Sequence, residues 1–255
     1  MIGPAALRAL NDIRMGFLIL TRVPVGTIAA PVPTMGASAW TWPLIGAVVG
    51  GISALVWGLG LYLGLPPLSA AMLAILAGTV ATGGLHEDGL ADLADGFGGG
   101  HDKARRLEIM RDSRIGSYGA LAIGFSLLIR VGALASLSLG GGALALVVLA
   151  AAGRAAMPAA LYLMPPARDD GLGHAAAAVS LPVAALALAC GVAALMTFGA
   201  VPALVTGGLM AAAASALGLL AMRRIGGQTG DVLGAMQQAA ELAGWLALSA
   251  LLGQG

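Results

Sequence analysis

The sequence predicts an all-α fold, a polytopic membrane helical bundle of about seven transmembrane helices with an N-terminal interfacial helix. Of its 255 residues, 59% are hydrophobic and only 10% are charged, and the mean hydropathy is +0.93. A soluble domain has about a quarter of its residues charged. Apolar runs of about 20 residues, the length needed to cross a bilayer, use most of the chain. We therefore expect one integral-membrane domain over residues 1–255.

The N-terminal segment predicts a helix that lies at the membrane interface. In "RALNDIRMGFLILTRVPVG" the apolar residues Leu10, Phe17 and Leu20 recur at roughly helical spacing, and charged residues interrupt the apolar run. Seven spans are expected after it, and the second of them is short enough to be tilted or partly re-entrant. The spans lie near 38–63, 67–84, 118–139, 142–164, 181–199, 202–222 and 235–252.

The basic residues predict the orientation of these spans. Lys and Arg near span ends are retained on the cytoplasmic side of a membrane. Eleven of the 13 Lys and Arg residues lie before the first span or in the segments 85–117, 165–180 and 223–234. We therefore expect these segments in the cytoplasm, with 85–117 as a catalytic loop.

The stretch "GGLHEDGLADLADGFGGG" at 83–100 carries the strongest chemical signal. Asp88, Asp92 and Asp95 are spaced i, i+4, i+7, so a helix would present them on one face. Three carboxylates on one face repel each other unless cations lie against them, and Mg²⁺ suits such oxygen ligands. We expect a Mg²⁺ site here, with His86 as a further candidate ligand. The alternative is a solvated acidic loop.

Basic residues follow the acidic stretch in "HDKARRLEIMRDSRIGSYG". Arg111 and Arg114 flank Asp112 and Ser113, and arginine makes bidentate contacts with phosphate. We expect these residues to bind a phosphate-containing substrate. The alternative for each basic residue is that it only fixes the orientation in the membrane.

The segment "RRIGGQTGDVLGAMQQAAEL" adds a second basic and acidic group. Arg223 and Arg224 are expected to bind substrate, and Asp231 either caps the last helix or joins the metal site. Arg130 and Arg154 lie inside spans, where charge is costly, so they predict a polar cavity that holds substrate. The alternative for both is a buried ion pair with Glu241.

Several classes of protein are excluded by what the sequence lacks. A net charge of +1 gives no reason to expect nucleic acid. The single cysteine, Cys190, excludes an intrachain disulfide. Walker A, HExxH and GxSxG patterns are absent, so the sequence gives no support for a nucleophilic Ser or Cys.

The motifs together resemble one family. "HEDGLADLADG", "RLEIMRDSRIGSYG", "GRAAMP", "RDDGLG" and "GGQTGDVLGA" occur in that order, and the chain resembles the adenosylcobinamide-GDP ribazoletransferase, or cobalamin synthase, family over residues 7–245. The resemblance implies a Mg²⁺-dependent enzyme of the bacterial inner membrane. It would join adenosylcobinamide-GDP to α-ribazole or its 5′-phosphate and release GMP. The lipid bilayer is a further expected partner, and homo-oligomerisation is left open.

The resemblance also implies roles for individual residues. The acidic motif is matched by His86, Asp88, Asp92 and Asp95, the second motif by Asp112, Ser113, Arg114 and Gly116, and the aspartate of the last loop by Asp231. We expect Asp88 and Asp92 on the metal and Asp95 as the base that accepts the proton of the ribazole 5′-hydroxyl. Asp112 and Arg114 are expected to be catalytic as well. Glu87 departs from the pattern, where an apolar residue is more often expected.

Two other functions are compatible with an acidic stripe in a membrane protein. CDP-alcohol phosphatidyltransferases also use membrane aspartates, but "FGGG" follows "DLADG" where their pattern requires Ala-Arg. An ion or metal transporter would place its carboxylates at mid-membrane on facing helices. Clustering of the aspartates in one cytoplasmic segment favours catalysis over transport.

Overall fold

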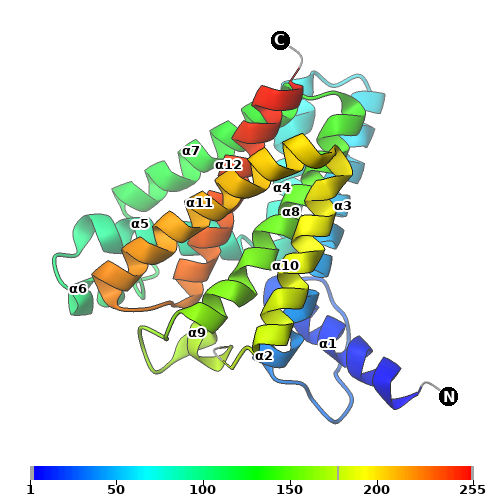
Figure 1. Ribbon diagram of the computed structural model, residues 1–255. Helices are drawn as coiled ribbons and strands as arrows, with labels where there is room; N and C mark the ends of the chain where they lie inside the picture. Colours follow the sequence, from blue (N-terminus) through cyan, green and yellow to red (C-terminus); the bar gives the residue numbers. More distant parts are fainter. Residues whose placement is uncertain (1–2, 177, 254–255) are drawn as a thin grey trace.

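The computed structural model describes residues 3–176 and 178–253, and this part of the chain is built from helices (Figure 1). The helices are α1 (Pro4–Leu20), α2 (Met35–Ser38), η1 (Ala39–Thr41), α3 (Trp42–Tyr62), α4 (Pro67–Thr82), α5 (Leu85–Gly99), α6 (Lys103–Ile109), α7 (Ser117–Ala135), α8 (Leu139–Leu163), α9 (Gly171–Ala175), α10 (Leu181–Leu195), η2 (Met196–Phe198), α11 (Ala200–Ile225) and α12 (Gly230–Leu252). The all-α prediction is confirmed. Helix α1 leaves the bundle at the end opposite the C-terminus.

Seven long helices coincide with the seven predicted spans: α3, α4, α7, α8, α10, α11 and α12. Five of the segments are long and apolar enough to cross a membrane on their own, and they contain α3, α7, α8, α10 and α11. Helix α4 meets the same criterion only together with α5. The protein is therefore a multi-pass membrane protein, and the expected number of spans is approximately right.

The second span ends in a sharp bend, and this bend sets the position of the acidic stretch. Helices α4 and α5 meet at an angle of 88°. Gly83 and Gly84 join them with φ of 69° and 72°, left-handed conformations that glycine adopts without strain. Helix α5 carries four carboxylates, and we count it as lying outside the spans. The predicted catalytic segment 85–117 contains the helices α5 and α6.

Small residues bring the spanning helices close together. A Cβ atom at Gly46 would lie 2.9 Å from the Cα of Ala151, and one at Gly50 would lie 2.6 Å from the Cα of Val147. Helix α3 therefore packs backbone against backbone on α8, as small residues allow in a membrane where no hydrophobic force drives helices together.

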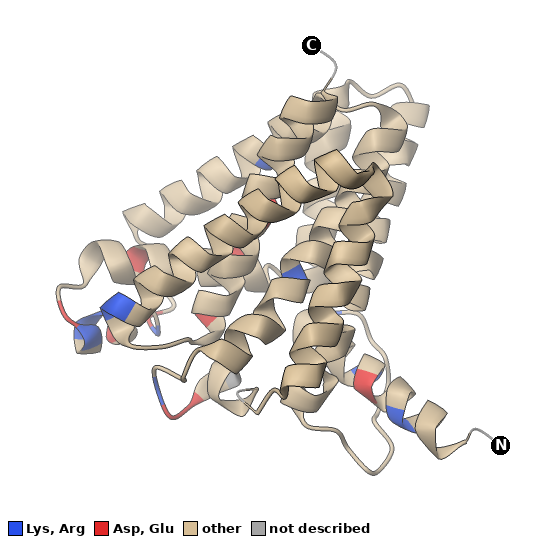
Figure 2. Ribbon diagram, viewed as in Figure 1, with Lys and Arg blue, Asp and Glu red and all other residues tan. Residues whose placement is uncertain are grey.

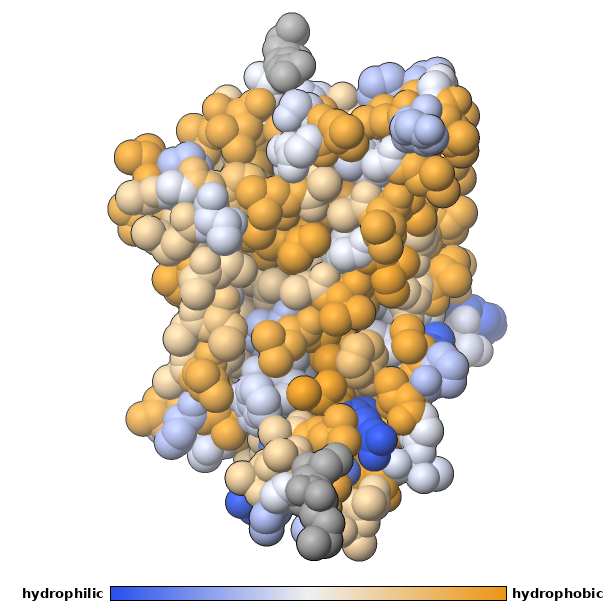
Figure 3. Space-filling view, turned by 90° about the vertical axis from the view of Figure 1, so that its right-hand side faces the viewer, coloured by the Kyte–Doolittle hydropathy of each residue, from blue (hydrophilic) through white to orange (hydrophobic). Residues whose placement is uncertain are grey.

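Charge is distributed unevenly over the molecule. Figure 2 shows that most charged residues lie toward the end that carries α1, α6 and α9, with few near the C-terminus. Figure 3 shows a side of the molecule covered mostly by hydrophobic residues, with the most hydrophilic ones toward its lower part. Large apolar side chains such as Leu55, Leu128 and Leu204 are exposed on the spanning helices, as expected for a surface that faces lipid.

Candidate active site

Helix α5 presents its aspartates on one face but at different depths. Asp88 is exposed, Asp92 is half-buried and Asp95 is buried. The i, i+4, i+7 spacing therefore places them in one row, as predicted, while their surroundings differ. One end of the row faces the start of α12, and the other faces the start of α7.

At the first end, α5 lies directly against the N-terminus of α12. A Cβ atom at Gly89 would lie 3.0 Å from the Cα of Asp231, so only glycine allows this approach. Asp231 is in the first turn of α12, and the Thr229 hydroxyl, which caps that helix, donates a hydrogen bond to Asp231 Oδ2 over 3.1 Å. Burial, together with the neighbouring carboxylates Asp88 and Asp231, raises the pKa of Asp92 to about 7. These carboxylates are thus close enough to repel one another.

One arginine faces this acidic group. Arg168 Nη2 lies 3.4 Å from Asp231 Oδ2. Two backbone hydrogen bonds of 2.8 Å, from Gln228 N to Pro165 O and from Ala167 N to Gln228 O, hold the segment of Arg168 beside the start of α12. The site therefore combines carboxylates with a fixed guanidinium, although the chain positions that supply them are far apart.

A second ion pair extends this group toward α6. Arg111 Nη2 donates to both oxygens of Asp170, over 2.7 and 2.6 Å, and Arg168 Nε lies 3.4 Å from Asp170 Oδ1. Arg111 thus binds a carboxylate here. The sequence alone does not assign Arg168 or Asp170 to the site, although both belong to the "RDDGLG" motif, which is the signal that points to them.

Asp95 has a different environment from Asp88 and Asp92. Its Oδ2 accepts a hydrogen bond from Gly116 N over 2.7 Å, and its Oδ1 accepts one from Gly119 N over 2.9 Å. Asp95 therefore ties α5 to the N-terminus of α7, where a carboxylate satisfies free backbone N–H groups. Its role as the base stays a prediction.

Asp112 and Arg114 lie in the turn before α7 and bind each other. Arg114 Nη2 donates to Asp112 Oδ2 over 2.6 Å, and this contact lowers the pKa of Asp112 to about 2. Both residues line an open groove of about 450 Å³ that also includes Asp95. Ser113 is exposed beside them. The second motif therefore lies at the α7 end of the aspartate row.

Arg223 and Arg224 are exposed in the last turn of α11. The carbonyl oxygen of Arg224 accepts a hydrogen bond from Arg106 Nη1 over 3.1 Å, so α6 packs on this end of α11. None of the described ion pairs involves Arg223 or Arg224, and their predicted contact with substrate remains a prediction.

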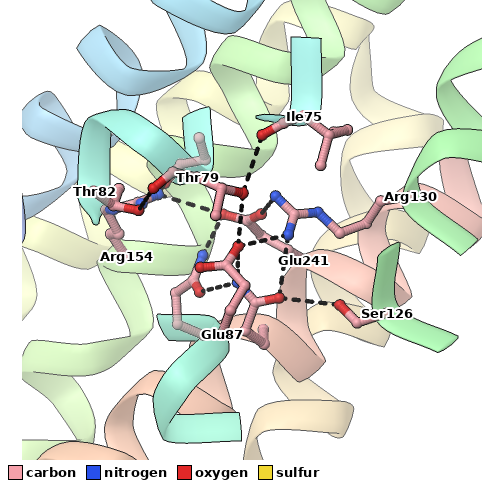
Figure 4. Close-up of polar contacts among 11 residues, drawn as sticks. Ile75, Thr79, Thr82, Glu87, Ser126, Arg130, Arg154 and Glu241 are labelled. Carbon is pink, nitrogen blue, oxygen red and sulfur yellow. Dashed lines mark hydrogen bonds and ion pairs between the residues drawn. The ribbon is translucent and has the colours of Figure 1, made fainter. Parts of the chain in front are cut away.

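Arg130 and Arg154 belong to a buried polar network in the core of the bundle (Figure 4). Arg130 Nη1 donates to Glu87 Oε1 over 2.8 Å, and Arg154 Nη1 lies 3.4 Å from Glu241 Oε1. Arg130 also lies 3.8 Å from Glu241. Two positive and two negative charges thus meet, which matches the alternative of a buried ion pair and gives Glu87 a partner.

Amide groups complete the core network. Gln238 Nε2 donates to Glu87 Oε1 over 3.3 Å and its Oε1 accepts from Ser126, while Gln237 donates to Glu241. A space of only about 30 Å³ lies among these groups. Arg130 and Arg154 therefore have buried protein partners, and this space is too small for a substrate. Their predicted contact with substrate stays untested.

The His86 side chain is more deeply buried than those of Asp88, Asp92 and Asp95. It is 1% exposed, and a Cβ atom at Gly234 would lie 3.3 Å from its Cα, so His86 packs between α5 and α12. Neither ring nitrogen has a hydrogen-bond partner within the described residues. Asp88, two residues further on, is exposed, and both residues line one cavity of about 130 Å³ beside Arg168 and Asp231.

The carboxylates at the α12 end fit Mg²⁺ by their chemistry. In the part of the chain that the structure describes, no three His, Cys, Asp or Glu side chains form a ready cage for a metal ion. Mg²⁺ is usually bound by one or two carboxylates and keeps water and substrate phosphate oxygens as its other ligands. Asp88, Asp92 and Asp231 supply such carboxylates, and their mutual repulsion would be relieved by a cation.

Comparisons with known proteins show the family of the chain. The family model for cobalamin-5-phosphate synthase matches residues 12–249. A relative from Mesorhizobium japonicum is 44% identical over 95% of this chain and 94% of its own length. A relative from Azorhizobium caulinodans is 47% identical over 92% of this chain and 94% of its own, and one from Bradyrhizobium diazoefficiens is 43% identical over 91% and 90%.

All three relatives are named adenosylcobinamide-GDP ribazoletransferase, an enzyme of the transferase class. No solved structure gives a significant match. The family model covers nearly the whole chain and every motif of the site, from the aspartate row to Asp231. The chain therefore belongs to the cobalamin-5-phosphate synthase family, whose members are transferases of cobalamin synthesis.

Proposed function

We propose that the protein joins adenosylcobinamide-GDP to α-ribazole, or to its 5′-phosphate, in a Mg²⁺-dependent reaction that releases GMP. The relatives with this activity in their names align over nearly their full length. The single observation that carries the proposal is the group formed by Asp88, Asp92, Asp231 and Arg168, because it combines ligands for Mg²⁺ with a guanidinium for phosphate.

Different residues of the chain would bind the metal ion and the phosphate. Asp88, Asp92 and Asp231 would hold the Mg²⁺, which neutralises charge on the pyrophosphate and on the departing phosphate. Arg168 would bind a phosphate oxygen, because its guanidinium already faces Asp231. Ion pairing with Asp170 keeps the Arg168 side chain in place.

The reaction would be a direct displacement at phosphorus. An oxygen of a free ribose hydroxyl of the ribazole forms a bond to the corrinoid-side phosphorus, and the bond from this phosphorus to the bridging oxygen breaks, so that the bridging oxygen leaves with GMP. The proton of this ribose hydroxyl passes to a carboxylate of the site. The sequence offers no activated Ser or Cys for a covalent intermediate.

The same proposal places the site on the cytoplasmic side of the bacterial inner membrane. Most charged residues lie toward one end of the bundle (Figure 2). Lys and Arg near span ends are retained in the cytoplasm.

The transporter alternative is not supported. Glu87 and Glu241 do meet in the core from facing helices, but Arg130 and Arg154 neutralise both of them. The family is one of transferases, and the exposed carboxylates lie at one end of the bundle.

Purified protein in vesicles tests the proposal. With adenosylcobinamide-GDP and α-ribazole present, GMP release should equal cobalamin formation and should stop when Mg²⁺ is chelated. GMP release that does not depend on ribazole, or activity with a CDP-alcohol instead, would contradict it. A chiral phosphorus on the corrinoid side should be inverted, since direct displacement inverts once.

A further inference from the structure

Glu87 lies in the first turn of α5, next to Asp88 in the sequence, but its side chain is buried in the core of the bundle. Its Oε1 accepts a hydrogen bond from Arg130 Nη1 of α7 over 2.8 Å (Figure 4). The same oxygen accepts a second one from Gln238 Nε2 of α12 over 3.3 Å, and Thr79 Oγ1 of α4 lies 3.5 Å from it. One carboxylate thus links α5 to three other helices.

Helix α5 needs such contacts, because its connection to α4 does not fix its direction. The two residues of that connection, Gly83 and Gly84, lack a side chain and have broad backbone freedom. At its other end α5 is held by Asp95, which accepts hydrogen bonds from two backbone N–H groups at the start of α7. The direction of α5 therefore depends on contacts at both ends, and Glu87 supplies the buried polar contacts at the first end.

A small tilt of α5 would be enough to disturb a Mg²⁺ site. Asp88 lies seven residues before Asp95, which is about 10 Å along the helix. If the Asp95 end stayed fixed, a tilt of about 10° would move Asp88 by about 2 Å relative to Asp231 of α12. Mg²⁺ requires oxygen ligands at about 2.0–2.1 Å in nearly ideal octahedral geometry, so a shift of this size would weaken its binding.

We propose that Glu87 is a positioning residue for the metal site: its contacts in the core network fix the direction of α5, so that the aspartates of α5 face Asp231. The inference rests on the proposed function, which assigns Mg²⁺ to these aspartates. Glu87 lines the small space in the core network, whereas Asp88 lines the separate cavity that Asp231 also lines. Glu87 therefore acts through α5 and does not touch the metal ion.

Glu241 provides a matched comparison within the same network. It is also a buried carboxylate, and it lies 3.4 Å from Arg154 and 3.8 Å from Arg130. It belongs to α12, and none of its described hydrogen bonds or ion pairs involves a residue of α5. Loss of either carboxylate leaves buried arginines short of negative charge, so both losses should destabilise the protein. Only the loss of Glu87 should affect the metal site.

Titration of the purified, substrate-free protein with Mn²⁺, followed by electron paramagnetic resonance, tests the inference without turnover. Mn²⁺ takes the same kind of oxygen ligands as Mg²⁺. Glu87→Gln should raise the Kd for Mn²⁺ about 10- to 100-fold, the usual effect of losing a residue that orients metal ligands. Glu241→Gln should lower the Tm in detergent by a similar amount but keep the Kd within about twofold.

A second variant keeps the test decisive if Glu87→Gln does not fold. Gln238→Met removes the amide contact from α12 but leaves the ion pair between Glu87 and Arg130 in place. It should raise the Kd for Mn²⁺ about threefold, as expected for the loss of one neutral hydrogen-bond donor.

An unchanged Kd in Glu87→Gln, or in Gln238→Met if the first variant does not fold, would overturn the inference. Equal increases in Glu87→Gln and Glu241→Gln would overturn it too, because the network would then act only through overall stability. Absence of Mn²⁺ binding by the unmodified protein would remove the metal site and the inference with it. The proposed function fails separately, if the unmodified protein binds Mn²⁺ but releases no GMP from adenosylcobinamide-GDP and α-ribazole.

Discussion

Arg168 Nη2 lies 3.4 Å from Asp231 Oδ2, although 63 residues separate the two in the sequence. The pair joins the segment after α8 to the first turn of α12 at the acidic site. Arg168 is the only arginine that the structure places beside the carboxylates Asp92 and Asp231 within the described ion pairs. Its position makes it the first residue to test.

Arg168→Met should lower kcat/KM for adenosylcobinamide-GDP about 10- to 100-fold, because a hydrogen bond to a charged group is worth about 1.5–3 kcal/mol. Steady-state GMP release in vesicles measures this. Arg105→Met is the control, since Arg105 is exposed and its one ion pair among the described residues is with Glu108. Equal losses in both variants would mean that Arg168 contributes only general positive charge.

Asp88→Asn and Asp92→Asn should each abolish turnover, because each substitution removes a negative charge that we assign to Mg²⁺ binding. The protein should still insert in the membrane, because asparagine has nearly the same size and shape as aspartate. Residual activity should need a higher Mg²⁺ concentration. Asp102→Asn is the matched control: Asp102 caps α6, and asparagine caps a helix about as well. Near-normal rates of either site variant at limiting Mg²⁺ would refute the metal assignment.

The Asp95→Asn variant tests whether Asp95 acts as the base or only holds α5 to the start of α7. Asparagine keeps one acceptor oxygen and loses the other, so one of the bonds from Gly116 and Gly119 should be lost. We expect faster amide hydrogen exchange at residues 116–120 together with lower activity. Loss of activity with unchanged exchange in this segment would instead support Asp95 as the base.

Arg154→Met should destabilise the protein by about 3–5 kcal/mol, because it leaves Glu241 buried without this partner. Thermal unfolding in detergent measures the loss. The double variant Arg154→Met with Glu241→Gln should recover part of the stability, since it removes the unpaired charge. An increase in KM without loss of stability would favour the predicted contact between Arg154 and substrate.

Cysteine labelling from outside the cell tests the orientation, after Cys190 is replaced by Ala. A cysteine at position 141, in the first turn of α8, should be labelled, and one at position 100, after α5, should not. The reason is the placement of basic residues near α5 and α6. The reverse result would put the site on the outer side and contradict the proposed localisation.

Much of the fold could be predicted from the sequence because the bilayer imposes a simple rule. A span needs about 20 apolar residues, so the lengths of the runs predicted the seven long helices, with ends close to those observed for α4 and α8. The bend between α4 and α5 was only partly foreseen, because it depends on two consecutive left-handed glycines, Gly83 and Gly84.

The sequence by itself determined which residues share a face of a helix, since the helical period fixes that locally. It therefore placed Asp88, Asp92 and Asp95 in one row. Only the tertiary structure decided what lies opposite each of them: Asp231 at one end and the backbone N–H groups at the start of α7 at the other. The physical reason is that close packing between helices, as at Gly89, fixes these neighbours, and no local pattern records which helix will lie there.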